Sequence, residues 1–149
     1  GIGYAMAAKY DNLDARVFVV ISEGEMYEGS IWEGAMCASK HSLNNLTVLV
    51  DYNKQQSYGS TYEVQDLEPI GDKWRAFGFG VAEVDGHDVE QIRSVLTNLP
   101  IDQGRPTTVI CHTIKGKGID YVEGNLDWHH KNRLSDDDIS ALKSALEAG

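Results

Sequence analysis

We predict an α/β fold with a mostly parallel sheet and helices on both faces, because apolar runs alternate with amphipathic stretches along the chain. The apolar runs are short, rich in β-branched residues and free of polar alternation, which is typical of strands buried on both faces. Strands are predicted at Val17–Ile21, Leu46–Val50, Val81–Val84 and Thr107–Cys111. Right-handed crossovers between such strands give one parallel sheet.

Helices are predicted between and after these strands. Their ranges are Gly3–Tyr10, Glu28–Ser42, Ile70–Phe77, Val89–Leu99 and Ile139–Ala148. Asp88 and Ser135 occupy N-cap positions, and each is followed three residues later by a side chain that can complete a capping box. Residues 53–68 and 114–134 show no regular pattern. Both segments follow strand ends, so we expect them on the ligand-binding side of the sheet.

The composition predicts one domain and excludes several classes of partner. The chain has 149 residues, 42% of them hydrophobic, which is enough for a single core. Its net charge of −10 and the lack of a basic stripe argue against binding to nucleic acid or to an anionic membrane surface. No apolar stretch approaches the roughly 18 residues of a membrane span. Cys37 and Cys111 are isolated, as expected of buried, reduced thiols in a cytoplasmic enzyme.

Polar residues follow the first two predicted strands. Ser22-Glu23-Gly24-Glu25 ends the first, and Asn53 follows the second, thirty residues after Glu23. Parallel strands place their carboxyl ends side by side, so we expect the Glu23 carboxylate and the Asn53 carboxamide to converge. Oxygen atoms of this kind, with phosphate oxygens, suit Mg²⁺ or Ca²⁺. Gly24 is then expected to present its N–H to a diphosphate; a tight turn at Gly24 and an Asx turn at Asn53 are the alternatives.

These motifs resemble the thiamine diphosphate signature of transketolases, in which Gly-Asp-Gly is followed about thirty residues later by Asn. The resemblance covers nearly the whole chain, with similar segments in the same order at 28–33, 51–54, 67–78, 84–88, 115–118 and 128–129. It implies a thiamine diphosphate-binding fold with thiamine diphosphate and Mg²⁺ (or Ca²⁺) as cofactors. The implied reaction transfers a two-carbon ketol unit between sugar phosphates.

The resemblance also implies roles for individual residues. With Glu23 and Asn53, the backbone carbonyl of Gln55 completes the metal ligands. His129 contacts diphosphate and substrate oxygens, and its imidazole titrates near working pH. Glu28 is expected near a dimer interface, where proton-sharing carboxylates couple two active sites. A solvated acidic start of a helix, favoured by the helix dipole, is the alternative for Glu28.

The chain departs from the family pattern in two places. The triplet reads Ser22-Glu23-Gly24, and His129 is followed by His130-Lys131-Asn132-Arg133 where the family has Gly-Lys-Ala-Pro. Glu23 adds a methylene where Mg²⁺ requires near-octahedral geometry at about 2.0–2.1 Å. Three alternatives remain for Glu23: the side chain reaches the metal through a changed rotamer or backbone, it favours the looser shell of Ca²⁺, or it marks a subgroup with altered cofactor affinity.

We expect residues 1–149 to form a diphosphate-binding domain that is incomplete at its N-terminus, because residues 1–10 read as the middle of a helix. The resemblance implies that the pyrimidine half of the cofactor binds a second domain or subunit. The expected partners are therefore sugar phosphates and that second chain, in a homodimer or heterotetramer. Two alternatives remain: a deoxyxylulose phosphate synthase or 2-oxoacid dehydrogenase component, and a non-catalytic assembly subunit, for which Glu23 is the main support.

Overall fold

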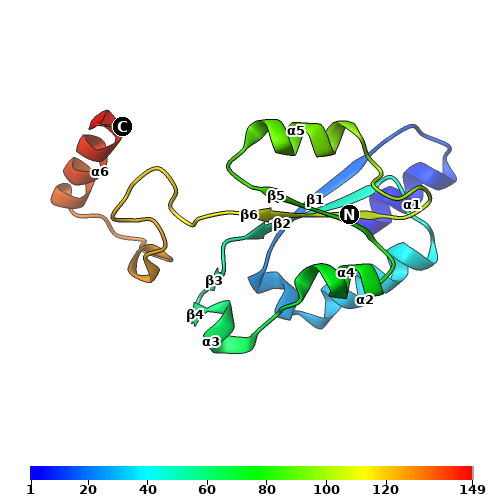
Figure 1. The fold of residues 1–149 in the computed structure, drawn as a ribbon, viewed down its shortest axis with the longest axis horizontal. Helices are drawn as coiled ribbons and strands as arrows, with labels where there is room; N and C mark the ends of the chain where they lie inside the picture. Colours follow the sequence, from blue (N-terminus) through cyan, green and yellow to red (C-terminus); the bar gives the residue numbers. More distant parts are fainter. Residues whose placement is uncertain (149) are drawn as a thin grey trace.

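The protein contains a four-stranded sheet in which every neighbouring pair of strands is parallel (Figure 1). The structure, a computed structural model, describes residues 1–148. The strands lie in the order β1-β2-β6-β5, with bounds Val17–Ser22, Leu46–Tyr52, Thr107–His112 and Gly80–Asp85. Each predicted strand is present and longer by one or two residues. The predicted parallel α/β fold is confirmed.

Helices cover both faces of the sheet. Figure 1 shows α2 (Gly29–Lys40) and α4 (Ile70–Ala76) on one face and α5 (Val89–Thr97) on the other. α1 (Ile2–Tyr10) packs beside α2. The predicted helix ends at Ser42 and Leu99 were wrong. Ser42 has φ +48°, which no right-handed helix contains.

Aromatic side chains form the centre of the core beneath α2 and α4. Trp74 is 1% exposed, and its ring centroid lies 5.2 Å from that of Trp32 and 5.0 Å from that of Phe79. Trp32 also stacks on Phe77 at 5.1 Å. These aromatic contacts join α2, α4 and the start of β5, so the core fixes the sheet against one helical layer.

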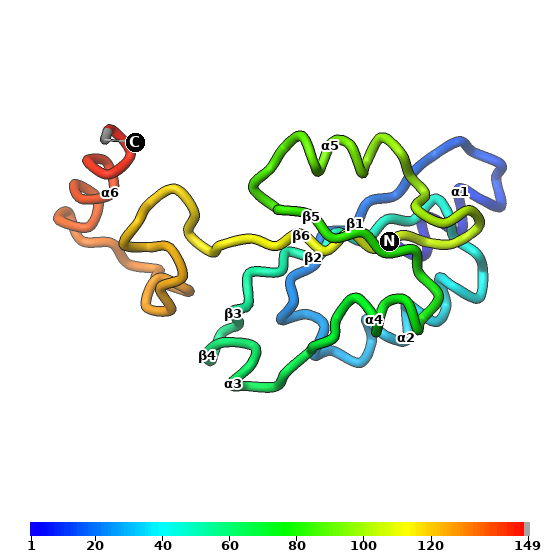
Figure 2. Tube along the Cα trace, in the orientation of Figure 1, coloured from blue at the N-terminus to red at the C-terminus, as the bar shows by residue number. Residues whose placement is uncertain are grey.

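Both predicted N-caps form. The Asp88 carboxylate accepts the backbone N–H groups of Glu90 and Gln91 at 2.9 and 3.0 Å. Ser135 and Asp138 exchange reciprocal backbone-to-side-chain hydrogen bonds of 2.9 and 3.1 Å. The last helix, α6 (Asp136–Ala148), consequently begins three residues earlier than predicted. Figure 2 shows α6 standing away from the sheet.

The two segments without a sequence pattern contain short elements that were not predicted. Residues 53–68 hold the hairpin of β3 (Gln55–Gln56) and β4 (Gly59–Ser60), followed by α3 (Thr61–Gln65). Ser60 starts α3 through a capping box, because its hydroxyl accepts the N–H of the residue three positions on at 3.2 Å. Residues 114–134 hold the 3₁₀ helix η2 (Leu126–Trp128). Elements this short lie below the length at which periodicity is visible.

Cys37 and Cys111 are free thiols, as predicted, but both are half-buried and not fully buried. Burial raises the pKa of the Cys111 thiol, and the Asp51 carboxylate adds to the rise. Cys111 therefore stays protonated at neutral pH. Within residues 1–148, no helix is both long and apolar enough to cross a membrane.

Candidate functional site

The end of β1 turns sharply into the 3₁₀ helix η1 (Gly24–Tyr27). The Ser22 N–H donates to the Glu25 carboxylate at 2.8 Å, and the Glu25 N–H donates to the Ser22 hydroxyl at 3.2 Å. This reciprocal pair has the pattern of a capping box, set one residue before the N-cap of η1, and it encloses Glu23 and Gly24. The spacing of Ser22 and Glu25 in the sequence is the signal for this box, which we did not predict.

Glu23 is a fully buried acid without a hydrogen-bond partner. Its side chain is 0% exposed, and neither carboxylate oxygen makes a hydrogen bond. Burial raises the pKa of Glu23 from 4.5 to about 7, and the Asp51 carboxylate adds to the rise. The backbone N–H groups of Lys54 and Gln55 oppose part of it, although neither reaches hydrogen-bond geometry. A buried carboxylate without a hydrogen-bond partner is costly when ionised, and a bound cation lowers that cost.

Asn53 lies beyond the end of β2 and forms the Asx turn considered from the sequence. Its side-chain oxygen accepts the Gln55 N–H at 3.1 Å, and its amide donates to the Asp51 carboxylate at 3.1 Å. Thr113, after β6, donates to the same Asp51 carboxylate. The Gln55 side chain donates to the Gly124 carbonyl at 2.6 Å. The segments that follow β2 and β6 are therefore joined at one edge of the sheet.

A cavity of about 390 Å³ lies at this edge. Its lining comes from the ends of β1 and β2, from η1, from the β3–β4 hairpin and from the segment after β6. The lining residues are Ser22, Gly24, Glu25, Glu28, Asp51, Asn53, Gln55, Gln56, Ser57, Lys115, His129 and His130. The cavity thus unites every predicted site residue except Glu23, which is buried next to the Lys54–Gln55 backbone.

Glu28 and Gly24 both line the cavity. Glu28 is exposed and occupies the N-cap position of α2, but its side chain makes no capping hydrogen bond. A Cβ atom added at Gly24 would meet only ordinary contacts, 3.6 Å from Gln56 and Ser22. Space alone therefore does not require glycine at position 24. Gly24 does lie at a strand-to-helix turn, where backbone N–H groups can bind phosphate. Its contact with a diphosphate therefore stays a prediction.

His129 presents a partly buried imidazole to the cavity. Its Nδ1 atom is buried and makes no hydrogen bond. Burial lowers the pKa of His129, and the nearby Lys115 and His130 lower it further. The imidazole is therefore neutral at pH 7, which leaves one ring nitrogen free to accept and one to donate. An unsatisfied buried nitrogen in a cavity wall is a group that a ligand can complete.

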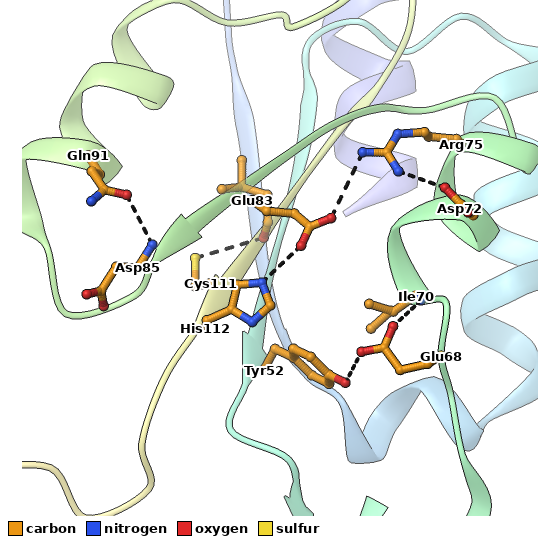
Figure 3. A network of polar contacts seen from close by, with 11 residues as sticks. Tyr52, Glu68, Ile70, Asp72, Arg75, Glu83, Asp85, Gln91, Cys111 and His112 are labelled. Carbon is orange, nitrogen blue, oxygen red and sulfur yellow. Dashed lines mark hydrogen bonds and ion pairs between the residues drawn. The ribbon is translucent and has the colours of Figure 1, made fainter. Parts of the chain in front are cut away.

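A second cavity, of about 700 Å³, adjoins the first and shares Asn53 and Lys115 with it. His112, at the end of β6, lines this larger cavity. Figure 3 shows Glu83 between His112 and Arg75, with Nε2–Oε2 and Nη2–Oε1 distances of 3.0 and 4.0 Å. These side chains are about half exposed, so the ion pairs contribute little stability.

The oxygen atoms at this edge of the sheet are of the type that suits a divalent cation. Within residues 1–148, no three His, Cys, Asp or Glu side chains converge as a metal site on their own. The oxygen groups at this edge include the orphaned Glu23 carboxylate, the Asn53 amide oxygen, which accepts the Gln55 N–H, and the Gln55 carbonyl. Such a set leaves coordination positions that phosphate oxygens and water would fill, as Mg²⁺ usually requires.

The fold is that of an α/β domain with a cavity at the carboxyl ends of its strands, where open parallel sheets generally bind ligands. Residues 4–148 match the family described as transketolase, thiamine diphosphate binding domain. The chain therefore belongs to the transketolase family.

Two relatives of this chain are named as transketolase subunits. The chain is 42% identical over 130 residues to a subunit of the apulose-4-phosphate transketolase of Phocaeicola vulgatus, covering 87% of this chain and 46% of that protein. It is 40% identical over 146 residues to the 6-deoxy-6-sulfo-D-fructose transketolase subunit SqwG of a Clostridium species, covering 98% and 53%. The chain thus spans about half the length of these relatives.

Solved transketolase structures share the fold. The enzyme of Pichia stipitis in complex with sedoheptulose 7-phosphate superposes with a TM-score of 0.86 at 26% identity, covering 98% of this chain and 23% of that one. The Campylobacter jejuni enzyme gives 0.85 at 27% identity, with coverage of 97% and 24%.

Proposed function

We propose that this chain is the diphosphate-anchoring part of a transketolase subunit that transfers a two-carbon ketol unit between sugar phosphates. The observation that carries the proposal is the orphaned Glu23 carboxylate, buried beside a cavity that contains Gly24, Asn53, Gln55 and His129. A buried charge without a partner is costly, and a divalent cation offsets that cost. Membership of the thiamine diphosphate-binding family supports the same ligand.

Each residue has a proposed task in binding or orientation. Glu23, Asn53 and the Gln55 carbonyl would hold Mg²⁺ or Ca²⁺, and Gly24 would offer its N–H to the diphosphate. Thiamine diphosphate, when bound, supplies the carbanion chemistry of ketol transfer. His129 would donate a hydrogen bond to diphosphate or substrate oxygens from its neutral imidazole. Glu28, exposed at the cavity rim, is the proposed link to a second site across a dimer interface.

The proposed partners follow from the same assignment. A second domain or subunit would bind the pyrimidine half of the cofactor, in a homodimer or a heterotetramer. The names of the two curated relatives, each called a transketolase subunit, support a partner chain. The cytoplasmic setting stays a prediction from the two free thiols.

A non-catalytic assembly role is the rival function, because Glu23 replaces the family Asp. The experiment that separates the two is calorimetric titration of thiamine diphosphate, with Mg²⁺ and then with Ca²⁺, into the full-length chain in complex with its partner. A ligand that binds the native state at 100 times its Kd raises stability by about 2.7 kcal/mol, so the melting temperature provides a second readout. Binding with ketol transfer supports the enzyme. Absence of binding under both metals would overturn the proposal and leave the assembly role.

A further inference from the structure

His130 holds a backbone conformation that L residues rarely adopt, with φ +88°. In the left-handed region the Cβ atom crowds the following carbonyl oxygen, so glycine is strongly favoured there. Strained residues persist only where the surrounding structure fixes them, and they gather at ligand-binding sites. Between residues 1 and 148, the non-glycine residues with positive φ are Asn12, Ser42, Lys54 and His130. Of these four, only His130 lines the 390 Å³ cavity.

Two contacts fix the His130 side chain in the cavity wall. Its Nε2 atom lies 2.9 Å from the Ser57 hydroxyl, which belongs to the tip of the β3–β4 hairpin. Its ring lies against that of His129, with centroids 4.4 Å apart. Ser57 and His129 line the same cavity. The strained backbone therefore delivers an imidazole to the wall, and two neighbours hold it there.

Acidic side chains and hydrogen-bond donors come from different elements around this cavity. Acidic side chains come from η1, from the N-cap of α2 and from the end of β2: Glu25, Glu28 and Asp51. Hydrogen-bond donors come from the segment after β6: Lys115, His129 and His130. A ligand that carries both an anionic group and a bound cation matches this arrangement. The carboxylates suit its cation, and the hydrogen-bond donors suit its anionic group.

We propose that His130 is a further binding residue of this site, whose imidazole donates a hydrogen bond to a phosphate oxygen of the ligand. The inference rests on the proposed function. Ser57 is the positioning residue: its hydroxyl lies 2.9 Å from Nε2, and in the tautomer in which this hydroxyl donates to Nε2, Nδ1 carries the proton that is offered to the ligand. Binding of that phosphate oxygen is the reason that position 130 retains a side chain in spite of the strained backbone.

The test compares variants that separate the side chain from the strain. His130→Gly and His130→Ala both remove the imidazole, but only Ala keeps the strained backbone. Without ligand, the Gly variant should melt about 2–4 °C above the Ala variant. In calorimetric titrations of the full-length assembly, both should bind thiamine diphosphate with Mg²⁺ about tenfold more weakly than wild type. His130→Asn tolerates positive φ and keeps a donor, so it should recover most of the affinity.

A phosphate oxygen belongs both to the cofactor and to a sugar phosphate, and two measurements distinguish them. A weaker Kd for thiamine diphosphate assigns the contact to the cofactor; a raised KM for the sugar phosphate at saturating cofactor assigns it to the substrate. Ser42→Gly is the matched control, because Ser42 also has positive φ but lies outside the cavity. It should leave both constants unchanged.

The inference is overturned if His130→Gly matches wild type in both constants, because the imidazole then serves only the hairpin. Wild type that fails to bind thiamine diphosphate under either metal overturns the proposed function, and this inference with it. The two failures are distinguishable, because wild type binds thiamine diphosphate in the first case and does not bind it in the second.

Discussion

Replacing Glu23 by Gln should have opposite effects with and without ligand. The side chain is fully buried without a hydrogen bond, and the pKa of Glu23 is about 7 in the fold against 4.5 for the free group. A carboxyl with a raised pKa stabilises the folded state fully below pH 4.5, and this contribution is lost as pH rises through 7. Gln has nearly the same shape and never ionises, so it avoids that loss.

The size of the effect follows from the two pKa values. At about 1.4 kcal/mol for each pKa unit, a rise from 4.5 to about 7 corresponds to about 3 kcal/mol at pH 8. For a protein of this size, each kcal/mol raises the Tm by roughly 2–4 °C. The unliganded Glu23→Gln variant should therefore melt several degrees above wild type at pH 8, and the gap should close as pH falls to 4.5.

The assay is thermal melting of the full-length protein at pH 5 and pH 8, first with a chelator and then with thiamine diphosphate plus Mg²⁺ or Ca²⁺. Wild type should gain stability from the ligands, and Glu23→Gln should gain much less because the divalent site has lost a full negative charge. Glu23→Asp keeps the charge with a shorter arm and should bind Mg²⁺ as well as wild type or better. Equal ligand stabilisation of wild type and Glu23→Gln under both metals would refute the metal-ligand assignment.

Three further predictions concern the core, the sheet edge and assembly. Trp74→Ala should lower the free energy of unfolding by about 3–5 kcal/mol in urea denaturation, because it empties the aromatic core; a loss below about 1 kcal/mol would contradict that packing. Tyr52→Phe removes the hydroxyl that donates to Glu68, as Figure 3 shows, and should cost about 1 kcal/mol in the same assay. The full-length chain should sediment as an oligomer with its partner, with α2 at the contact; a monomer at high concentration is the contrary result.

The sequence was sufficient to predict the sheet and the edge at which most of the predicted site residues gather. Uninterrupted apolar runs identify buried parallel strands, and parallel strands end at one edge. That geometry alone brings Gly24, Asn53 and Gln55 to one cavity, although they are far apart in the chain. The cap at Asp88 was equally visible, because a capping box depends only on residues three positions apart.

Other features of the site depend on contacts between distant residues and could not be predicted. The β3–β4 hairpin is joined to the segment after β6 by the Gln55–Gly124 hydrogen bond, which spans 69 residues. The complete burial of Glu23 results from several elements that close over it, so the sequence suggested a metal ligand but not a buried orphan. The contact of His130 with Ser57 likewise joins residues 73 positions apart, which no local pattern connects.

The position of α6 has a consequence for cofactor binding. Lys131 lies 4.0 Å over the Trp128 ring and 2.9 Å from the Asp138 carboxylate in the first turn of α6. The two histidines of the cavity wall lie between Trp128 and Lys131, so they are attached to a helix that stands away from the sheet. Lys131 and Trp128 therefore connect the segment that carries these imidazoles to the first turn of α6. If a partner chain binds α6 and the cofactor contacts these imidazoles as proposed, assembly and cofactor binding share a coupling free energy, and each changes the other's affinity by the same factor.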